Sequence, residues 1–122
     1  MPGLTNAESQ ATLDARFPTT GATDHIAYSA NGTSETASLA RTAIGATGWS
    51  AATNADPSVK ANANVLTSAT ASAGVTVTHF AIYSASTAGT QRTDWQALAS
   101  SRTLAIGDSL QWAVGAAQIT LT

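Results

Sequence analysis

The sequence contains no cysteine and very little charge. Only 10 % of its 122 residues are Asp, Glu, Lys or Arg, and only 6 % are aromatic. Without cysteine there is no disulfide framework, no thiolate catalysis and no cysteine-based metal site, and this is compatible with synthesis in a reducing cytoplasm. Charge is far below the usual quarter of residues. The surface must therefore consist mainly of Thr, Ser, Asn, Gln and Ala, which suits a protein packed into a larger assembly.

A basic patch is also missing. The formal net charge is −2 and the isoelectric point is near 5.4, so we expect no binding to nucleic acid or to an anionic membrane surface. No run approaches the roughly 18 apolar residues of a membrane-spanning helix. No apolar segment follows Met1, so a secretory signal is not expected either. The five cations are dispersed along the chain: Arg16, Arg41, Lys60, Arg92 and Arg102.

The length predicts one domain over residues 1–122, which we expect to be rich in β-strands. Its core should be thin, because much of the 43 % apolar fraction is alanine. A helix is predicted at the N-terminus, within residues 5–17. Thr5 and Glu8 have the spacing of a capping box, and Pro18 ends the helical run. The helical segment is expected over Asn6 to Arg16.

The middle of the chain predicts shorter elements. Asn31-Gly32 is a strong hairpin signal, and it predicts a strand at 25–28 followed by a return strand at about 36–44. The periodicity at the end of the return strand is ambiguous and also fits a helix. A loop with Gly45 and Gly48 is expected to present Trp49. Residues 50–72 are low in complexity, and we expect an extended segment with a turn at Asp56-Pro57 and one strand at about 63–67.

Residues 75–122 carry most of the large apolar side chains and are predicted to form the core antiparallel sheet unit. The apolar side chains change parity within 75–83, which indicates a bulge near His79 or a strand buried on both faces. Gly107-Asp108 predicts a tight turn, and 119–121 a terminal strand. The expected fold is an antiparallel β-sandwich or flattened barrel with one short N-terminal α-helix.

Reactive groups do not cluster in the sequence. Asp24 and His25 are adjacent, but neighbouring residues of a strand point to opposite faces and are badly placed to bond to each other. The two histidines, His25 and His79, lie far apart and give a weak metal signal. No nucleophile elbow or phosphate loop is present. We therefore name no catalytic, cofactor-binding or metal-ligating residue and expect no enzyme.

Surface recognition is a separate possibility. The loop at Asn31 and Gly32 and the side chain of Trp49 are the candidate recognition residues. Trp49 with an exposed tyrosine has the chemistry to stack on a sugar ring, although tryptophans in a thin core more often fill that core.

A series of short motifs follows in order along nearly the whole chain: Leu4-Thr5-Asn6-Ala7-Glu8, Tyr28-Ser29-Ala30, Ala40-Arg41-Thr42-Ala43-Ile44, Val77-Thr78-His79-Phe80-Ala81-Ile82-Tyr83, Trp95-Gln96-Ala97-Leu98, Arg102-Thr103-Leu104, Gly107-Asp108 and Gln118-Ile119-Thr120-Leu121. In these motifs the chain resembles small tailed-bacteriophage virion proteins of the tail fibre or minor tail type.

The resemblance implies a non-enzymatic structural protein of the virion, made in the host bacterial cytoplasm and assembled in multiple copies. A homo-oligomer is expected, with a trimer as the first choice, bound to other virion proteins of the tail or to the major capsid protein. The alternatives are a capsid decoration protein and a carbohydrate-binding module that contacts host-surface glycans through Trp49.

Overall fold

A computed structural model describes residues 5–55 and 57–121. Leu4 of the resemblance, Asp56 of the expected turn and Thr122 of the expected sheet unit lie outside the described residues. The chain divides into two compact units. Unit 1 comprises the described parts of Met1–Ala22, Ile44–Val65 and Trp112–Thr122, and unit 2 comprises Thr23–Ala43 and Leu66–Gln111. That the chain forms a single domain stays a prediction.

Helix α1 (Asn6–Arg16) belongs to unit 1 and has the predicted bounds. The backbone N–H of Glu8 donates to the hydroxyl of Thr5 over 3.2 Å, so the expected N-cap is confirmed. At the other end, the N–H of Phe17 donates to the carbonyl of Leu13 over 2.8 Å. Leu13 and Phe17 are both buried, and burial stabilises each side chain by about 1.5–3 kcal/mol. The helix packs against strand β3.

Strands β3 (Ser58–Ala61) and β8 (Gln118–Leu121) form the antiparallel sheet of unit 1. Their register places Ser58 opposite Leu121 and Ala61 opposite Gln118. Burial alternates along β3, with Ser58 and Lys60 fully buried, as expected for a strand with one covered face. The terminal strand predicted at 119–121 is confirmed within β8.

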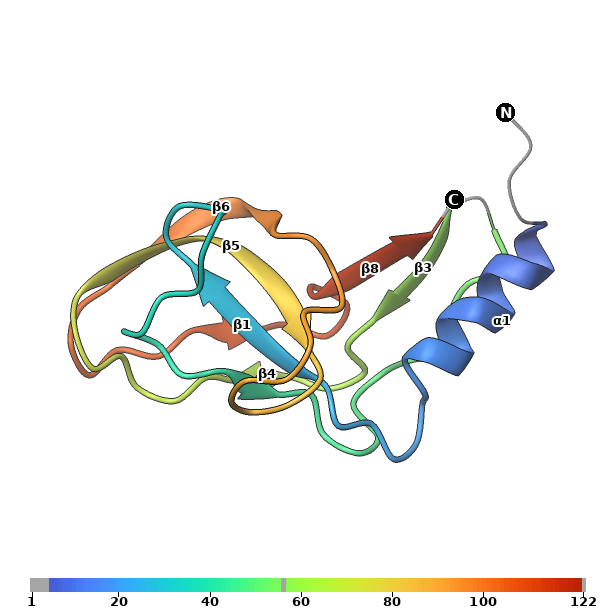
Figure 1. The fold of residues 1–122 in the computed structure, drawn as a ribbon, viewed down its shortest axis with the longest axis horizontal. Coiled ribbons are helices and arrows are strands. Elements are labelled where there is room, and N and C mark those ends of the chain that lie inside the picture. Colours follow the sequence, from blue (N-terminus) through green and yellow to red (C-terminus); the bar gives the residue numbers. More distant parts are fainter. Residues whose placement is uncertain (1–4, 56, 122) are drawn as a thin grey trace. The chain divides into compact units, whose positions relative to one another are not determined.

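Unit 2 contains a four-stranded sheet in the order β2-β1-β5-β6. The strands are β1 (His25–Ser29), β2 (Thr42–Ala43), β5 (Val75–Tyr83) and β6 (Gln96–Leu104), and each adjacent pair is antiparallel. Figure 1 shows β5 between β1 and β6. Ile26, Ala27 and Tyr28 have no exposed surface, so β1 is buried on both faces and forms the centre of this unit.

The predicted bulge near His79 is confirmed. Val77 pairs with Arg102 and His79 pairs with Ala97, so one residue of β5, Thr78, faces four residues of β6. The extra residues lie on β6, and β5 itself carries no insertion. Beyond the bulge, Phe80, Ala81 and Ile82 are all buried, so this part of β5 is covered on both faces, which accounts for the change in apolar parity.

Strand pairing differs from the sequence-based expectation in the last third of the chain. β5 and β6 lie in the four-stranded sheet of unit 2, whereas β8 pairs with β3 in unit 1. β6 runs without interruption from Gln96 to Leu104. The turn at Gly107-Asp108 forms, with the N–H of Asp108 donating to Ala105, but β7 (Gln111–Trp112) then pairs with β4 (Leu66–Thr67).

The hairpin predicted at Asn31-Gly32 is a longer loop. The chain does reverse there, since the N–H of Thr36 donates to the carbonyl of Tyr28 over 2.8 Å. Regular pairing with β1 begins only at β2, where His25 faces Ala43 and Ile26 faces Thr42. The mainly β class, with antiparallel sheets and one short N-terminal helix, is confirmed for the described residues.

Candidate functional site

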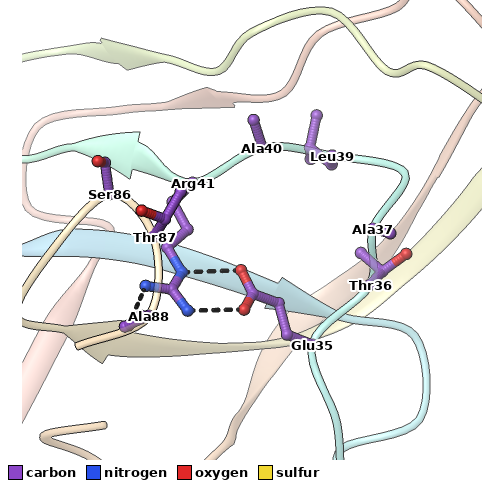
Figure 2. Close-up of a pocket in the computed structure, with 9 residues that line it drawn as sticks. All are labelled: Glu35, Thr36, Ala37, Leu39, Ala40, Arg41, Ser86, Thr87 and Ala88. Carbon is purple, nitrogen blue, oxygen red and sulfur yellow. Dashed lines mark hydrogen bonds and ion pairs between the residues drawn. The ribbon is translucent and has the colours of Figure 1, made fainter. Parts of the chain in front are cut away.

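A cluster around Arg41 joins two loops of unit 2. Arg41 precedes β2, and its guanidinium faces the carboxylate of Glu35 in a two-pronged ion pair (Figure 2). Nε and Nη2 each donate to one carboxylate oxygen over 2.8 Å. Only 7 % of the Arg41 side chain and 29 % of the Glu35 side chain are exposed. Paired hydrogen bonds of this kind fix orientation as well as charge.

The same guanidinium holds the loop after β5. Nη1 donates to the carbonyls of Ala85 and Ala88 over 2.9 and 2.8 Å. The guanidinium carbon lies 3.9 Å from the centre of the Tyr83 ring, in the geometry of a cation–π contact. The Glu35 hydrogen bond raises the pKa of Arg41 above its ordinary value, although burial opposes this. Arg41 is therefore a permanent positive charge that ties residues 35–41 to residues 85–88.

An open depression of about 360 Å³ lies beside this cluster. Figure 2 shows that its walls come from the segment before β2 and from the loop after β5. The walls offer hydroxyls, small apolar groups and a carboxylate already paired to arginine. The carboxylate among these lining groups, that of Glu35, is occupied by its ion pair with Arg41. The lining residues are Glu35, Thr36, Ala37, Leu39, Ala40, Arg41, Ser86, Thr87 and Ala88.

The predicted recognition residues Asn31 and Gly32 lie in one compact loop of unit 2. The Asn31 side-chain oxygen accepts the backbone N–H groups of Thr33 and Ser34 over 2.9 and 3.0 Å. The hydroxyl of Ser29 accepts the N–H of Gly32 over 2.9 Å. These side-chain bonds compete with strand pairing and close the loop locally. Asn31 is exposed and Gly32 is partly exposed.

Trp49, the third predicted recognition residue, has a different environment. Only 2 % of it is exposed, and its ring lies edge-on to Phe17 with the centroids 5.8 Å apart. The expectation that its loop presents the indole at the surface is thus corrected: the ring belongs to the core of unit 1. The aromatic residues that retain partial exposure in unit 2 are Tyr83 and Trp95, whose ring centroids lie 6.1 Å apart.

Asp24 and the two histidines are engaged in structural contacts. Asp24 is 1 % exposed and accepts from Arg92 over 2.6 Å, and the Nδ1 of His25 lies 2.9 Å from the carbonyl of Thr23. The Nδ1 of His79 lies 2.7 Å from the hydroxyl of Thr78. Among residues 5–55 and 57–121, no group of three or more His, Cys, Asp or Glu is placed to hold a metal ion.

The sequence-based reasoning did not predict the ion pairs Glu35–Arg41, Asp14–Lys60 and Asp24–Arg92. Glu35 and Arg41 are six positions apart, a spacing that is informative only once the chain reversal is known. Asp14 and Lys60 are 46 positions apart and meet because α1 packs on β3, with Lys60 Nζ 2.7 Å from Asp14 Oδ1. No local pattern indicates such a pair. The sequence carried one signal for these pairs, the scarcity of charge. Because so few residues are charged, each charged side chain is a candidate for a structural ion pair.

A family model described as podophage GP4 fiber I protein gp80 matches residues 5–120. The chain belongs to this family. The family match confirms the resemblance to a phage tail-fibre-like structural protein. A search of curated proteins found no match. In the described part of the chain, no helix has the length and apolar character needed to cross a membrane.

Proposed function

We propose that this member of the fibre family is a non-enzymatic structural component of the phage particle, of the minor tail or tail-fibre type, present in multiple copies. The observation that carries the proposal is the family match over residues 5–120. Its place is the virion, its site of synthesis is the host bacterial cytoplasm, and its partners are other copies of itself and other virion proteins.

The chemistry of unit 2 supports a structural role. Arg41 forms an ion pair, two hydrogen bonds to carbonyls and a ring contact. All of these contacts hold two loops in place. Side-chain networks of this kind rigidify a surface and give it a defined shape. A rigid, weakly charged surface suits repeated contacts within an assembly better than steering of a charged ligand.

The test is location in the particle. Particles carrying an epitope-tagged copy of the chain are purified, heads and tails are separated on a density gradient, and each fraction is probed for the tag. We expect the tag in the tail fraction. Recovery with heads would favour the capsid decoration alternative, and absence from washed particles would overturn the proposal. A tagged non-virion phage protein expressed at the same level controls for carry-over.

The carbohydrate-binding alternative stays a prediction. The burial of Trp49 weighs against stacking through that ring. A glycan contact through the loop at Asn31 and Gly32 remains compatible with the exposure of Asn31. Binding of host-wall glycans to the wild-type chain and to Asn31→Ala distinguishes these possibilities.

A further inference from the structure

Asn31 is the asparagine that glycine follows in this sequence, since alanine or valine follows each of the others. The backbone nitrogen after an asparagine can attack the side-chain carbonyl carbon and close a five-membered imide ring. Glycine favours this closure because it has no Cβ to crowd the approach of its own nitrogen. Asn31 is exposed, so water can reach the ring that forms. The two residues therefore have the local chemistry of a deamidation site.

The loop after β1 polarises the side-chain carbonyl of Asn31. Its Oδ1 accepts the backbone N–H groups of Thr33 and Ser34 over 2.9 and 3.0 Å and the hydroxyl of Thr33 over 3.0 Å. During attack by the next nitrogen, negative charge develops on this oxygen. Donors that already point at the atom where charge develops stabilise the transition state. The three donors are therefore placed to favour formation of the imide.

Ser29 connects the attacking nitrogen to the same oxygen. Its hydroxyl is buried, accepts the N–H of Gly32 over 2.9 Å and can donate to Asn31 Oδ1 over 3.1 Å. The oxygen of this hydroxyl also lies 2.6 Å from the carbonyl of Ser34, and a serine hydroxyl hydrogen rotates to suit its partner. Ser29 can thus accept the proton of the Gly32 nitrogen while it passes its own proton to Oδ1.

The position of Gly32 is fixed from another side by His79. A Cβ added to Gly32 would lie 2.9 Å from the imidazole, so the ring rests against the glycine backbone. The Asn31 amide nitrogen, which is the leaving group, donates to the exposed hydroxyl of Ser34 over 3.2 Å. Reacting groups that are held in place react faster when the held geometry is close to that of the attack.

We propose that Asn31-Gly32 is a self-modification site whose reaction is accelerated by the folded loop. The nitrogen of Gly32 forms a bond to Cγ of Asn31 while Ser29 transfers one proton from that nitrogen to Oδ1. The bond between Cγ and Nδ2 then breaks, the proton on Oδ1 passes to Nδ2, and ammonia leaves. Water opens the resulting imide at one of its two carbonyls and leaves aspartate or isoaspartate at position 31.

The modification changes both the charge and the shape of an exposed loop. A neutral amide becomes a carboxylate, so the formal net charge changes from −2 to −3. In the isoaspartate product the backbone runs through the former side chain, which displaces the acceptor that organises Thr33 and Ser34. The proposal goes beyond the proposed function and does not depend on it, because the reaction is intramolecular and is measured on the purified chain.

The rate in the folded chain provides the main test. Folded full-length chain is incubated at neutral pH and physiological temperature, and peptide mass mapping follows conversion at Asn31. The reference is the same chain unfolded in urea, and we expect the folded rate to be higher by about tenfold or more. Asn64 is exposed but precedes valine, so it is the internal control and should remain unmodified over the same period.

Two substitutions test the assigned contacts. Ser29→Ala removes the proton relay and is expected to lower the folded rate by about tenfold or more while leaving the unfolded rate unchanged. Ser58→Ala, at an equally buried serine of unit 1, is the matched control and should not alter the rate at Asn31. Thr33→Ala removes one donor at an exposed position and should lower the folded rate by about two- to tenfold. Circular dichroism establishes that each variant is folded, and Thr33→Ala carries the test if Ser29→Ala does not fold.

Hydrogen bonds that only immobilised the loop would slow the reaction relative to the unfolded chain, so the sign of the comparison is decisive. A folded rate equal to or below the unfolded rate would overturn the proposal. A faster folded rate that neither substitution lowers would also overturn it, because the acceleration would then arise outside these contacts. Neither result bears on the presence of the chain in particles, by which the proposed function is measured.

Discussion

The ammonium group of Lys60 lies 2.7 Å from the carboxylate of Asp14, with the lysine side chain fully buried and 37 % of the aspartate side chain exposed. The same carboxylate oxygen accepts the backbone N–H of Ala52 over 2.9 Å. Asp14 therefore connects α1 to β3 and to the segment before it. Burial of a lysine charge is costly unless a partner compensates it, so unit 1 depends on this aspartate.

Asp14→Asn is expected to destabilise unit 1 because it leaves the buried Lys60 charge uncompensated. We expect a loss of about 1–3 kcal/mol in the free energy of unfolding, less than for a completely buried pair since Asp14 is partly exposed. Urea unfolding followed by tryptophan fluorescence measures this. Asp94→Asn, at an exposed residue outside unit 1, is the control and should change stability by less than about 0.5 kcal/mol. Equal effects of the two substitutions would contradict the role of Asp14.

The same ion pair predicts a pH dependence of stability. Burial by itself raises the pKa of Asp14, but the hydrogen bonds from Lys60 and Ala52 and the charge of Lys60 outweigh it and hold the pKa below its ordinary value of 3.8. A carboxyl whose folded pKa is lowered stabilises the fold above the unfolded pKa and loses that contribution as the pH falls through the folded pKa. Stability should therefore decline below about pH 4, and this part of the decline should be absent in Asp14→Asn. Parallel pH profiles for both proteins would count against the assignment.

Arg41→Lys keeps the charge but removes the two-pronged pairing with Glu35 and the planar contact over Tyr83. We expect a loss of about 1–3 kcal/mol and faster amide hydrogen exchange, by about tenfold, for residues 84–90. Ser84 and Thr90 form a backbone hydrogen bond there, which gives the exchange measurement a defined reporter. Arg102→Lys, at an exposed edge position, is the control. Unchanged exchange in 84–90 would show that the loop holds its shape without Arg41.

Gly32→Ala combines two costs at the loop after β1. Gly32 has a φ of +77°, and an added Cβ would lie 2.9 Å from the His79 ring. Gly107 has a φ of +88° with nothing within 4 Å of the added atom, so Gly107→Ala isolates the backbone cost of about 1 kcal/mol. We expect Gly32→Ala to be more destabilising in thermal or urea unfolding, and His79→Ala to relieve the excess. Equal effects at both glycines would mean that the ring moves aside freely.

Trp49→Ala is expected to cost about 3–5 kcal/mol because it empties a site in the core of unit 1. Trp95→Ala, at a half-buried ring, should cost less. Any loss of glycan binding in Trp49→Ala should therefore accompany loss of near-ultraviolet circular dichroism. A folded Trp49→Ala variant that specifically loses glycan binding would instead support the carbohydrate-binding alternative.

Local chemistry determined several elements in full. The Thr5 cap and Pro18 delimit α1. Both act on residues within a few positions of each other, where backbone sterics and a side-chain cap need no help from the rest of the chain. The register shift expected near His79 also forms, although its extra residues belong to β6, some 20 positions later.

The tertiary structure determined which strands and side chains of this chain contact one another. β8 pairs with β3 and not with the strands that precede it, Trp49 enters a core, and Lys60 meets Asp14 across 46 positions. At Asn31-Gly32 a correct signal for reversal produced a side-chain-capped loop, since the Asn31 oxygen bonds to nearby N–H groups. The sequence patterns indicate which side chains are suited to burial or to pairing. The distant surface that buries or pairs each of them is determined only in the folded chain, because it depends on the combined packing of all the elements.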